Sequence, residues 1–276
     1  MRGIGTFCAS SPSVDSASPT SHDRAMELAG KTALVTGSAR RLGKAIALEL
    51  ASRGASIVVH YGSSEEAARE TAADIEALGV SAWPVQADLR APADIERLFD
   101  RIEELSRGLT VLVNNASSFE SEPFLEIDVE SWDKVLALNL RAPFLCIQRA
   151  TAMMRAAGGG VIINIADRSA FEPWKKFAHH GTSKAALVQL TRAAAHELAP
   201  EVRVNCVVPG AILPPPGISE SGEFWRKRGD VVPLGRTGAK GEVTAAVAFL
   251  ACNEFITGAV LPVDGGEHLK APRAVS

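Results

Sequence analysis

The chain has 276 residues, of which 46% are hydrophobic and 22% are charged, and this composition can fill the core of one large globular domain. The formal net charge of -3 provides no overall positive field for nucleic acid or for an anionic membrane surface. We therefore expect a small-molecule partner and no nucleic-acid or membrane partner.

Residues 1–25 differ in composition from the rest of the chain. They are rich in Ser, Pro, Ala and Thr without an apolar period, so we expect a disordered extension, followed by a single domain over residues 26–276. The apolar stretch after Ile4 is short and interrupted by glycine, unlike an export signal. A transit peptide and a translation start at Met26 stay open. No stretch of the sequence approaches the length of a membrane span.

Short β-branched runs alternate with longer helical patterns from Leu28 onward. Most of these runs are apolar throughout, as expected for strands buried on both faces of a sheet. The alternation predicts a doubly wound parallel sheet of about seven strands, which is a Rossmann-type α/β domain. The expected strands are 31–35, 56–60, 82–86, 109–113, 161–165, 203–208 and 258–263, and the expected helices are 42–53, 65–78, 93–105, 129–141, 143–156, 181–198 and 242–251.

The first expected strand leads into a glycine-bearing turn, Thr36-Gly-Ser-Ala-Arg-Arg-Leu-Gly43, and then into a helix. Such a turn lets backbone N–H groups approach a pyrophosphate, and the helix N-terminus adds a favourable partial charge. An ordinary strand-to-helix turn is the alternative. Later strands also end in polar or turn-forming residues at 88–89, 114–117 and 209–210, where a ligand is expected in this class of sheet. Together these features favour a nucleotide site.

The end of the second expected strand indicates which nicotinamide cofactor binds. Selection of NAD usually depends on an Asp or Glu at this point, and the segment His60-Tyr-Gly-Ser-Ser64 contains none. Arg40 and Arg41 instead offer fixed positive charge suited to a 2′-phosphate, and Ser63 and Ser64 offer hydroxyl groups. We therefore expect NADPH. The alternative is that Arg40 is a solvated loop residue.

His180 and Lys184 are the most informative pair of residues in the second half of the chain. They are four residues apart in a helical stretch, so their side chains lie on one face.

The four cysteines, at 8, 146, 206 and 252, form no C-x-x-C pair and indicate reduced thiols in a cytoplasmic protein. No group of His, Asp or Glu has the spacing of a metal site, so no metal is expected.

These features resemble the short-chain dehydrogenase/reductase family over nearly all of residues 28–268. The matching elements are the Thr36–Gly43 turn, Asp88-Leu89, Asn114–Ala116, Asn139, the 180/184 pair, Pro209-Gly210 and Val263–Gly266. Within the family the sequence is most similar to the pteridine reductase branch. Arg41 matches an arginine in place of the middle glycine, His60-Tyr61 matches a His-Tyr pair, residues 114–119 match Asn-Asn-Ala-Ser-Ser-Phe, and Asp167 matches an aspartate in place of the catalytic serine.

The sequence departs from this pattern at two places. Pteridine reductases carry an arginine where this chain has Gly62-Ser63, and the family carries a tyrosine where this chain has His180. By resemblance, the tail at 263–266 is similar to an interface segment, which implies a homotetramer. Loop 213–229 usually closes over substrate in the family, and Trp174 and Trp225 are each either pocket-wall or structural residues.

The resemblance implies an NADPH-dependent reductase with Asn139, Asp167, His180 and Lys184 as catalytic residues. It implies that Asp88 and Leu89 contact the adenine of the cofactor, that Asn115, Ala116 and Lys184 hold its nicotinamide half, and that the Pro209–Ile212 segment binds the carboxamide. Further cofactor contacts are implied along the glycine turn and at the end of the second strand. Together the implied cofactor contacts are Gly37, Arg40, Arg41, Leu42, Gly43, His60, Tyr61, Gly62, Ser63, Ser64, Asp88, Leu89, Asn115, Ala116, Ser117, Lys184, Pro209, Gly210 and Ile212. The implied substrate contacts are Ser117, Phe119 and Trp174. An aromatic ring at Phe119 suits a planar heterocycle, and a loop-anchoring role is its alternative.

Three interpretations of His180 stay open. His180 is the proton donor together with Asp167, or it is a bystander while Asp167 or water supplies the proton, or the protein binds nucleotide without turnover. An imidazole titrates nearer to neutral pH than a phenol, but it reaches less far toward a substrate. The expected substrate is a planar heterocycle such as a dihydropterin, or a related C=N or C=O compound. A general carbonyl or enone reductase is the alternative activity, and a silent NADP-binding sensor or partner protein is the alternative from another class.

Overall fold

The structure is a computed structural model that describes residues 26–106, 108–215 and 217–269. The extension predicted over residues 1–25 lies outside the described residues, as do residues 270–276 of the predicted domain. Among the described residues, no helix combines the length and the hydrophobicity that crossing a membrane requires.

Seven parallel strands form one sheet in the order β3-β2-β1-β4-β5-β6-β7. The chain moves outward from β1 to β3 and then returns to β4 on the other side of β1. The carboxyl ends of β1 and β4 are therefore neighbours, and a ligand crevice is expected between them. The Rossmann-type fold and all seven strands are confirmed. The strands are β1 Thr32–Val35, β2 Ser56–Tyr61, β3 Ala82–Gln86, β4 Val111–Asn114, β5 Gly160–Ile165, β6 Val202–Pro209 and β7 Val260–Val263.

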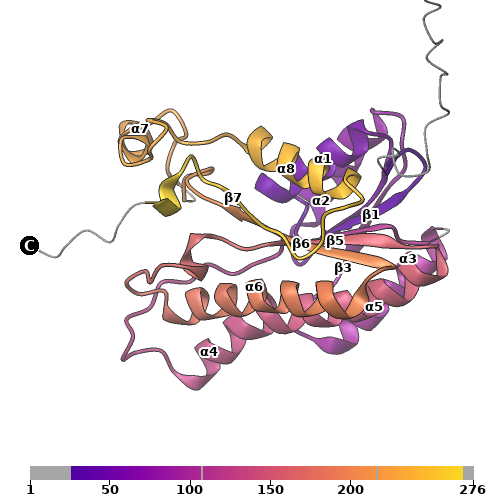
Figure 1. Cartoon of the computed structure of the whole chain (residues 1–276), viewed down its shortest axis with the longest axis horizontal. Coiled ribbons are helices and arrows are strands. Elements are labelled where there is room, and N and C mark those ends of the chain that lie inside the picture. The colour runs from indigo at the N-terminus through magenta and orange to yellow at the C-terminus, as the bar shows by residue number, and fades with distance from the viewer. Residues whose placement is uncertain (1–25, 107, 216, 270–276) are drawn as a thin grey trace, which may run out of the picture.

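Helices cover both faces of the sheet (Figure 1). One face carries α1, α2 and α8, and the other carries α3, α4, α5 and α6. The short helix α7 lies apart from these two layers, toward the C-terminal end of the described chain. The helices are α1 Arg41–Ser52, α2 Glu65–Glu76, α3 Pro92–Leu105, α4 Val129–Leu136, α5 Ala142–Ala156, α6 Ala178–Leu198, α7 Glu223–Gly229 and α8 Lys240–Cys252.

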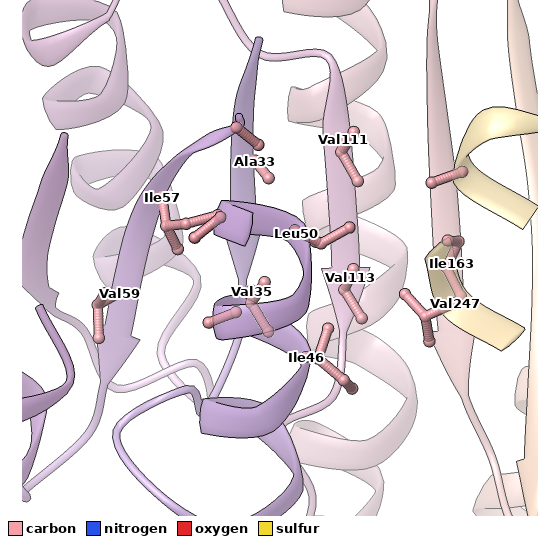
Figure 2. Close-up of a cluster of buried hydrophobic side chains, with 14 of the residues drawn as sticks. Ala33, Val35, Ile46, Leu50, Ile57, Val59, Val111, Val113, Ile163 and Val247 are labelled. Atoms are coloured by element: carbon pink, nitrogen blue, oxygen red, sulfur yellow. The ribbon is translucent and has the colours of Figure 1, made fainter. Parts of the chain in front are cut away.

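Apolar strand residues form the centre of both layers. Figure 2 shows Ile46 and Leu50 of α1 packed over Val35 and Val113 of the two central strands. All four side chains are fully buried. This packing holds α1 against the two strands whose carboxyl ends border the crevice.

The helix boundaries differ from the predicted ones at two places near the expected catalytic residues. The stretches predicted as 129–141 and 143–156 form one continuous helical run, with a π turn, η1, at Ala137–Arg141. Pro143 lacks the N–H that would close the regular hydrogen bond to residue 139, which accounts for the widened turn. Helix α6 begins at Ala178 rather than at 181, so His180 lies in its first turn.

Helix α7 is absent from the predicted elements, because only seven residues separate Gly222 from Asp230 and they show no apolar period. Two short 3-10 turns complete the fold, η2 at Arg168–Ala170 and η3 at Glu267–Leu269. Trp225 is buried inside α7 against Ala211 and Val232, so of its two possible roles the structure shows the structural one.

Candidate functional site

The ends of β1 and β4 are joined by hydrogen bonds from the turn that follows β1. Thr36 Oγ1 accepts the backbone N–H groups of Asn115 and Ala116 at 2.9 and 3.0 Å. Asn115 Nδ2 donates to the Thr36 carbonyl at 2.9 Å. A Cβ atom added to Gly43 would lie 2.2 Å from the Gly37 carbonyl oxygen. The first turn of α1 therefore approaches the glycine turn so closely that only glycine, which has no Cβ, fits at position 43.

A pocket of about 430 Å³ lies at this crevice. Most of the residues predicted to bind the cofactor line it, and the N-terminus of α1 faces it, as expected for a pyrophosphate site. The glycine cradle, the two arginines and the adjoining helix terminus all fit a nicotinamide dinucleotide. The predicted residues in the lining are Gly37, Arg40, Arg41, Leu42, Gly43, His60, Gly62, Asp88, Leu89, Asn115, Ala116 and Ser117.

Other predicted cofactor residues lie outside the lining of this pocket. Tyr61 packs against the core, while Lys184, Pro209, Gly210 and Ile212 belong to elements beyond the pocket edge. Ser63 and Ser64 are next to it, and Ser64 Oγ accepts a hydrogen bond from Arg40. The sequence reasoning missed four lining residues, Ala87, Arg90, Leu138 and Leu213.

Arg41 has a left-handed backbone conformation, with φ of +54°. This conformation costs a non-glycine residue about 1–2 kcal/mol. The guanidinium compensates in part, because its Nη2 donates to the Pro214 carbonyl at 2.7 Å and so joins the turn to the segment after β6. Across the pocket, Arg90 binds both carboxylate oxygens of Asp88 and lowers the pKa of that side chain against the opposing effect of burial.

His60 supports the glycine turn from below. Its Nδ1 accepts the backbone N–H of Gly37 at 2.9 Å, which leaves Nε2 to donate to the Ala87 carbonyl at 3.1 Å. Only the neutral ring can accept at Nδ1. Burial lowers the pKa of His60 from 6.5 to about 4, so the ring is neutral in the folded protein at pH 7.

His60 is therefore expected to make stability depend on pH. The unfolded chain binds a proton at His60 below about pH 6.5, whereas the folded protein binds one only below about pH 4. The contribution of neutral His60 to the free energy of unfolding is fully present above pH 6.5. It falls by about 3 kcal/mol as the pH drops from 6.5 to 4. Urea unfolding from pH 7 to pH 4 measures the loss. His60→Asn keeps an acceptor for Gly37 and should flatten the curve, while the exposed His196→Asn should leave it unchanged.

The residues predicted to be catalytic meet at the N-terminal end of α6. His180 Nε2 lies 2.7 Å from Asp167 Oδ2, and His180 Nδ1 lies 3.0 Å from the Ser118 carbonyl oxygen. Both of these partners are hydrogen-bond acceptors, while the Asn139 amide Nδ2, which can only donate, also lies 3.4 Å from His180 Nδ1. The His180 side chain is only 1% exposed and that of Asp167 is 22% exposed. Within this pair, the carboxylate is the group that reaches solvent.

Asn139 connects the loop after β4 to this pair. Its Oδ1 accepts the Ser118 N–H at 2.9 Å, and its Nδ2 donates to Ser183 Oγ at 3.1 Å. The π turn thereby holds the Ser118 carbonyl that faces His180. Sequence reasoning did not identify Ser118, because its contribution is a backbone carbonyl and no side-chain pattern reveals it.

Lys184 is buried one turn further along α6, and its Nζ donates to the Ile165 carbonyl at 3.0 Å. Burial lowers the pKa of Lys184, and the charge of Asp167 opposes that shift. For Asp167 itself, burial favours the neutral acid, but the hydrogen bond from His180 and the charge of Lys184 outweigh it and lower the pKa to about 2. Asp167 is therefore a carboxylate at neutral pH.

An aromatic cluster adjoins the pair. The ring of Phe119 stacks on Phe177 with centroids 4.5 Å apart, and meets His180 edge-on at 5.0 Å. Phe119 is 56% exposed, so more than half of its surface is open to a ligand. Trp174 lies edge-on to Phe119 at 6.3 Å and lines a second pocket of about 840 Å³ together with Phe177.

The described part of the chain holds no group of three or more His, Cys, Asp or Glu side chains placed to bind a metal ion. Cys146 and Cys206 are buried free thiols, and Cys252 is a half-buried one.

A parallel sheet with a glycine turn and a polar pair at its carboxyl edge defines a dinucleotide-binding oxidoreductase, and the comparisons with known proteins agree. Residues 37–268 match the family model described as enoyl-(acyl carrier protein) reductase. The chain is 38% identical to 3-oxoacyl-[acyl-carrier-protein] reductase FabG of Aquifex aeolicus (strain VF5), over 87% of this chain and 98% of the relative.

Two solved structures are similar over almost their whole length. The promiscuous reductase LugOII, which catalyses keto-reduction at C1 during lugdunomycin biosynthesis, is 36% identical, with a TM-score of 0.82 over 88% of this chain and 100% of that one. A short-chain dehydrogenase from Burkholderia cenocepacia J2315, in complex with NADP, is 33% identical, with a TM-score of 0.81 over 88% and 99%. The chain belongs to the short-chain dehydrogenase/reductase family and is an NAD(P)-dependent oxidoreductase.

Proposed function

We propose that this protein uses NADPH to reduce a ketone on a planar, ring-bearing compound. The observation that carries the proposal is the Asp167–His180 contact of 2.7 Å beside the half-exposed ring of Phe119. The keto-reduction named for LugOII and the 3-oxoacyl substrate of the FabG relative support carbonyl chemistry. Bound NADPH would supply the hydride. The glycine turn, Arg40, Arg41, Asp88, Asn115 and Ala116 would hold the cofactor.

The substrate oxygen must gain a proton as its carbon gains hydride. Both ring nitrogens of His180 are engaged and the ring is buried, so it does not reach a substrate directly. We infer that Asp167 faces the substrate, that His180 stands behind it in place of the family's tyrosine, and that the transferred proton leaves His180 Nε2 and passes through Asp167. The hydrogen bond from His180 and the charge of Lys184 keep Asp167 a carboxylate before the transfer. Asn139 positions the ring through Ser118.

Steady-state NADPH oxidation tests the activity directly. The substrate panel contains planar cyclic ketones, a 3-oxoacyl thioester and a dihydropterin. We expect the cyclic ketones to give the highest kcat/KM. A preference of at least about tenfold for the thioester would exclude the planar-ring assignment, since tenfold corresponds to about 1.4 kcal/mol of transition-state binding.

A dihydropterin is the second candidate substrate, and the exposed aromatic ring of Phe119 favours it because a pterin is also planar. Phe119→Ala should weaken binding of a planar ligand by about 1–3 kcal/mol, with NADPH affinity unchanged. Val129→Ala, at another exposed apolar residue, is the matched control. Turnover of the dihydropterin in preference to the ketones would replace the first candidate by the second.

We expect NADPH to bind at least about tenfold more tightly than NADH, a difference of about 1.4 kcal/mol. The reason is that Arg40 and Arg41 line the pocket and no acidic residue stands at 62–64. Arg40→Ala should weaken NADPH binding and leave NADH binding nearly unchanged, as measured by fluorescence titration. Arg69→Ala, at an exposed arginine paired with Glu65, is the control. Equal dissociation constants for the two cofactors in the wild type would contradict this selection.

We also propose a homotetramer. Leu136, Leu140, Phe144 and Leu190 line a surface pocket of about 470 Å³ on the α4–α6 layer, and Phe144 is 43% exposed. An apolar hollow beside a half-exposed aromatic ring offers a surface on which a second copy of the chain can pack. Light scattering after size-exclusion chromatography should give four times the chain mass, and Phe144→Glu should lower it.

A further inference from the structure

The carboxylate of Glu267, in η3, links two other parts of the chain, η2 and α7. Its Oε1 forms ion pairs with Arg168 of η2 and with Arg228 of α7. The carboxylate is only 4% exposed, while the side chains of Arg168 and Arg228 are 11% and 30% exposed. A buried carboxylate between two arginines is costly to disturb, because loss of the carboxylate removes the acidic partner that both arginines share. We call Glu267, Arg168 and Arg228 the Glu267 anchor.

Each partner of Glu267 is next to a part of the site. Arg168 directly follows Asp167, and its other guanidinium nitrogen binds Glu172, which accepts the indole N–H of Trp174 at 2.7 Å. A Cβ atom added to Gly210 would lie 3.2 Å from Glu267 Oε2, so the carboxylate also adjoins the Pro209–Ile212 segment. The anchor thereby contacts the neighbourhood of Asp167, the Trp174 arm and the predicted carboxamide segment.

The link to α7 is the second half of the argument. Arg228 is in the last turn of this seven-residue helix, and the residues after it pack on the turn that precedes η3. Leu234 N–H donates to the Gly265 carbonyl at 3.2 Å. A helix of this length is marginal alone, so its position depends on tertiary contacts such as Arg228 and the buried Trp225.

We propose that Glu267 is a positioning residue that fixes α7 and the Asp167–Trp174 arm in one arrangement around the bound substrate. The proposal deepens the proposed function and rests on it, because the arm matters only if Asp167 faces the substrate. Arg228 governs where α7 lies against Ala211 of the Pro209–Ile212 segment, and Arg168 governs where Asp167 lies. Loss of the first contact should therefore raise KM, and loss of the second should lower kcat.

The test compares Arg228→Gln and Glu267→Gln with Lys227→Gln. Lys227 is the matched control, since it is on the same helix, loses the same charge and is paired with Glu223 at side-chain exposures of 70% and 69%. Hydrogen–deuterium exchange of the full-length protein, with and without NADPH, is measured over segments 168–174 and 223–229. NADPH oxidation is then measured with a ketone that the wild type reduces.

We expect Arg228→Gln to speed exchange over 223–229 by about tenfold and to raise KM by about tenfold with kcat nearly unchanged. Glu267→Gln should speed exchange over both segments and lower kcat by about tenfold to a hundredfold, since a displacement of about 1 Å has that effect. Arg228→Lys keeps the charge and should restore most of the loss in KM, which a merely structural defect would not allow.

Two outcomes separate the possible failures. If the wild type reduces none of the ketones, the proposed function fails, while the exchange data still decide whether Glu267 holds both segments. If Arg228→Gln matches Lys227→Gln in exchange and in KM, the positioning role is wrong. If Glu267→Gln fails to fold, Arg228→Gln is compared with Arg228→Lys and Lys227→Gln instead, and this comparison decides whether the positioning role is right. Arg228→Gln is expected to fold, because Arg228 is 30% exposed and its loss leaves Glu267 paired with Arg168.

Discussion

Replacing His180 by alanine is expected to lower kcat by about 10²–10⁴ and to change NADPH affinity by less than about twofold. The imidazole is the proton source behind Asp167, and its removal leaves the carboxylate without a proton to pass on. The ring lies outside the lining of the dinucleotide pocket, so cofactor binding should be retained. Single-turnover measurements at saturating NADPH separate the chemical step from binding.

Asp167→Asn is expected to cause a loss of similar size. An amide cannot carry a proton from His180 to the substrate, although it keeps the shape of the side chain. Because the two residues act in series, the double variant should be little slower than either single variant. Ser169→Ala is a useful control, since Ser169 N–H and Oγ bind Asp167 Oδ1, whereas His180 binds Oδ2.

The interpretations of His180 predict different activities for these variants. A bystander histidine predicts near wild-type activity for His180→Ala and a collapse only for Asp167→Asn. Restoring the pair that the family resemblance implies, with Asp167→Ser and His180→Tyr together, should return turnover, because Lys184 and Asn139 are in place. Activity that survives both His180→Ala and Asp167→Asn would remove the proton path altogether.

The sheet could be predicted from the sequence because its strands are apolar on both faces. Ile57, Val58 and Val59 are all fully buried, as expected for a strand that helices cover on both faces of the sheet. The polar ends of β1 and β4 likewise reveal their roles, since Thr36 and Asn115 bind each other across the crevice. Local sequence and overall topology agree at these positions.

The parts that could not be predicted depend on contacts between distant residues. Ser118 contacts His180 through its backbone carbonyl, which no side-chain pattern reveals. Arg90 can be identified as a residue of the pocket only from its contact with Asp88. Glu267 is an ordinary surface-type residue in the sequence, and its burial follows from Arg168 and Arg228, which are 99 and 39 positions away. The burial of His180 is also a tertiary property, because the rings of Phe119 and Phe177 that approach it come from two separate loops.

The close approach between α1 and the glycine turn gives a prediction for the cofactor site. Gly43→Ala places a methyl group 2.2 Å from the Gly37 carbonyl oxygen and 2.7 Å from Asn115 Nδ2. The nearest atom belongs to the backbone, so the turn itself must move. We expect a loss of stability at or above the upper end of the usual range for overpacking, about 3 kcal/mol, as measured by urea unfolding.

NADPH affinity should fall with it by at least about tenfold, because the displaced turn no longer directs its N–H groups at the pyrophosphate. Gly62→Ala is the matched control: Gly62 lines the same pocket, has no positive φ, and an added Cβ there would meet nothing within 4 Å. That variant should be as stable as the wild type and bind NADPH about equally well. If Gly43→Ala keeps wild-type affinity for NADPH, the pyrophosphate does not bind at this turn, and the cofactor contacts assigned to Gly37 and Arg41 lose their basis.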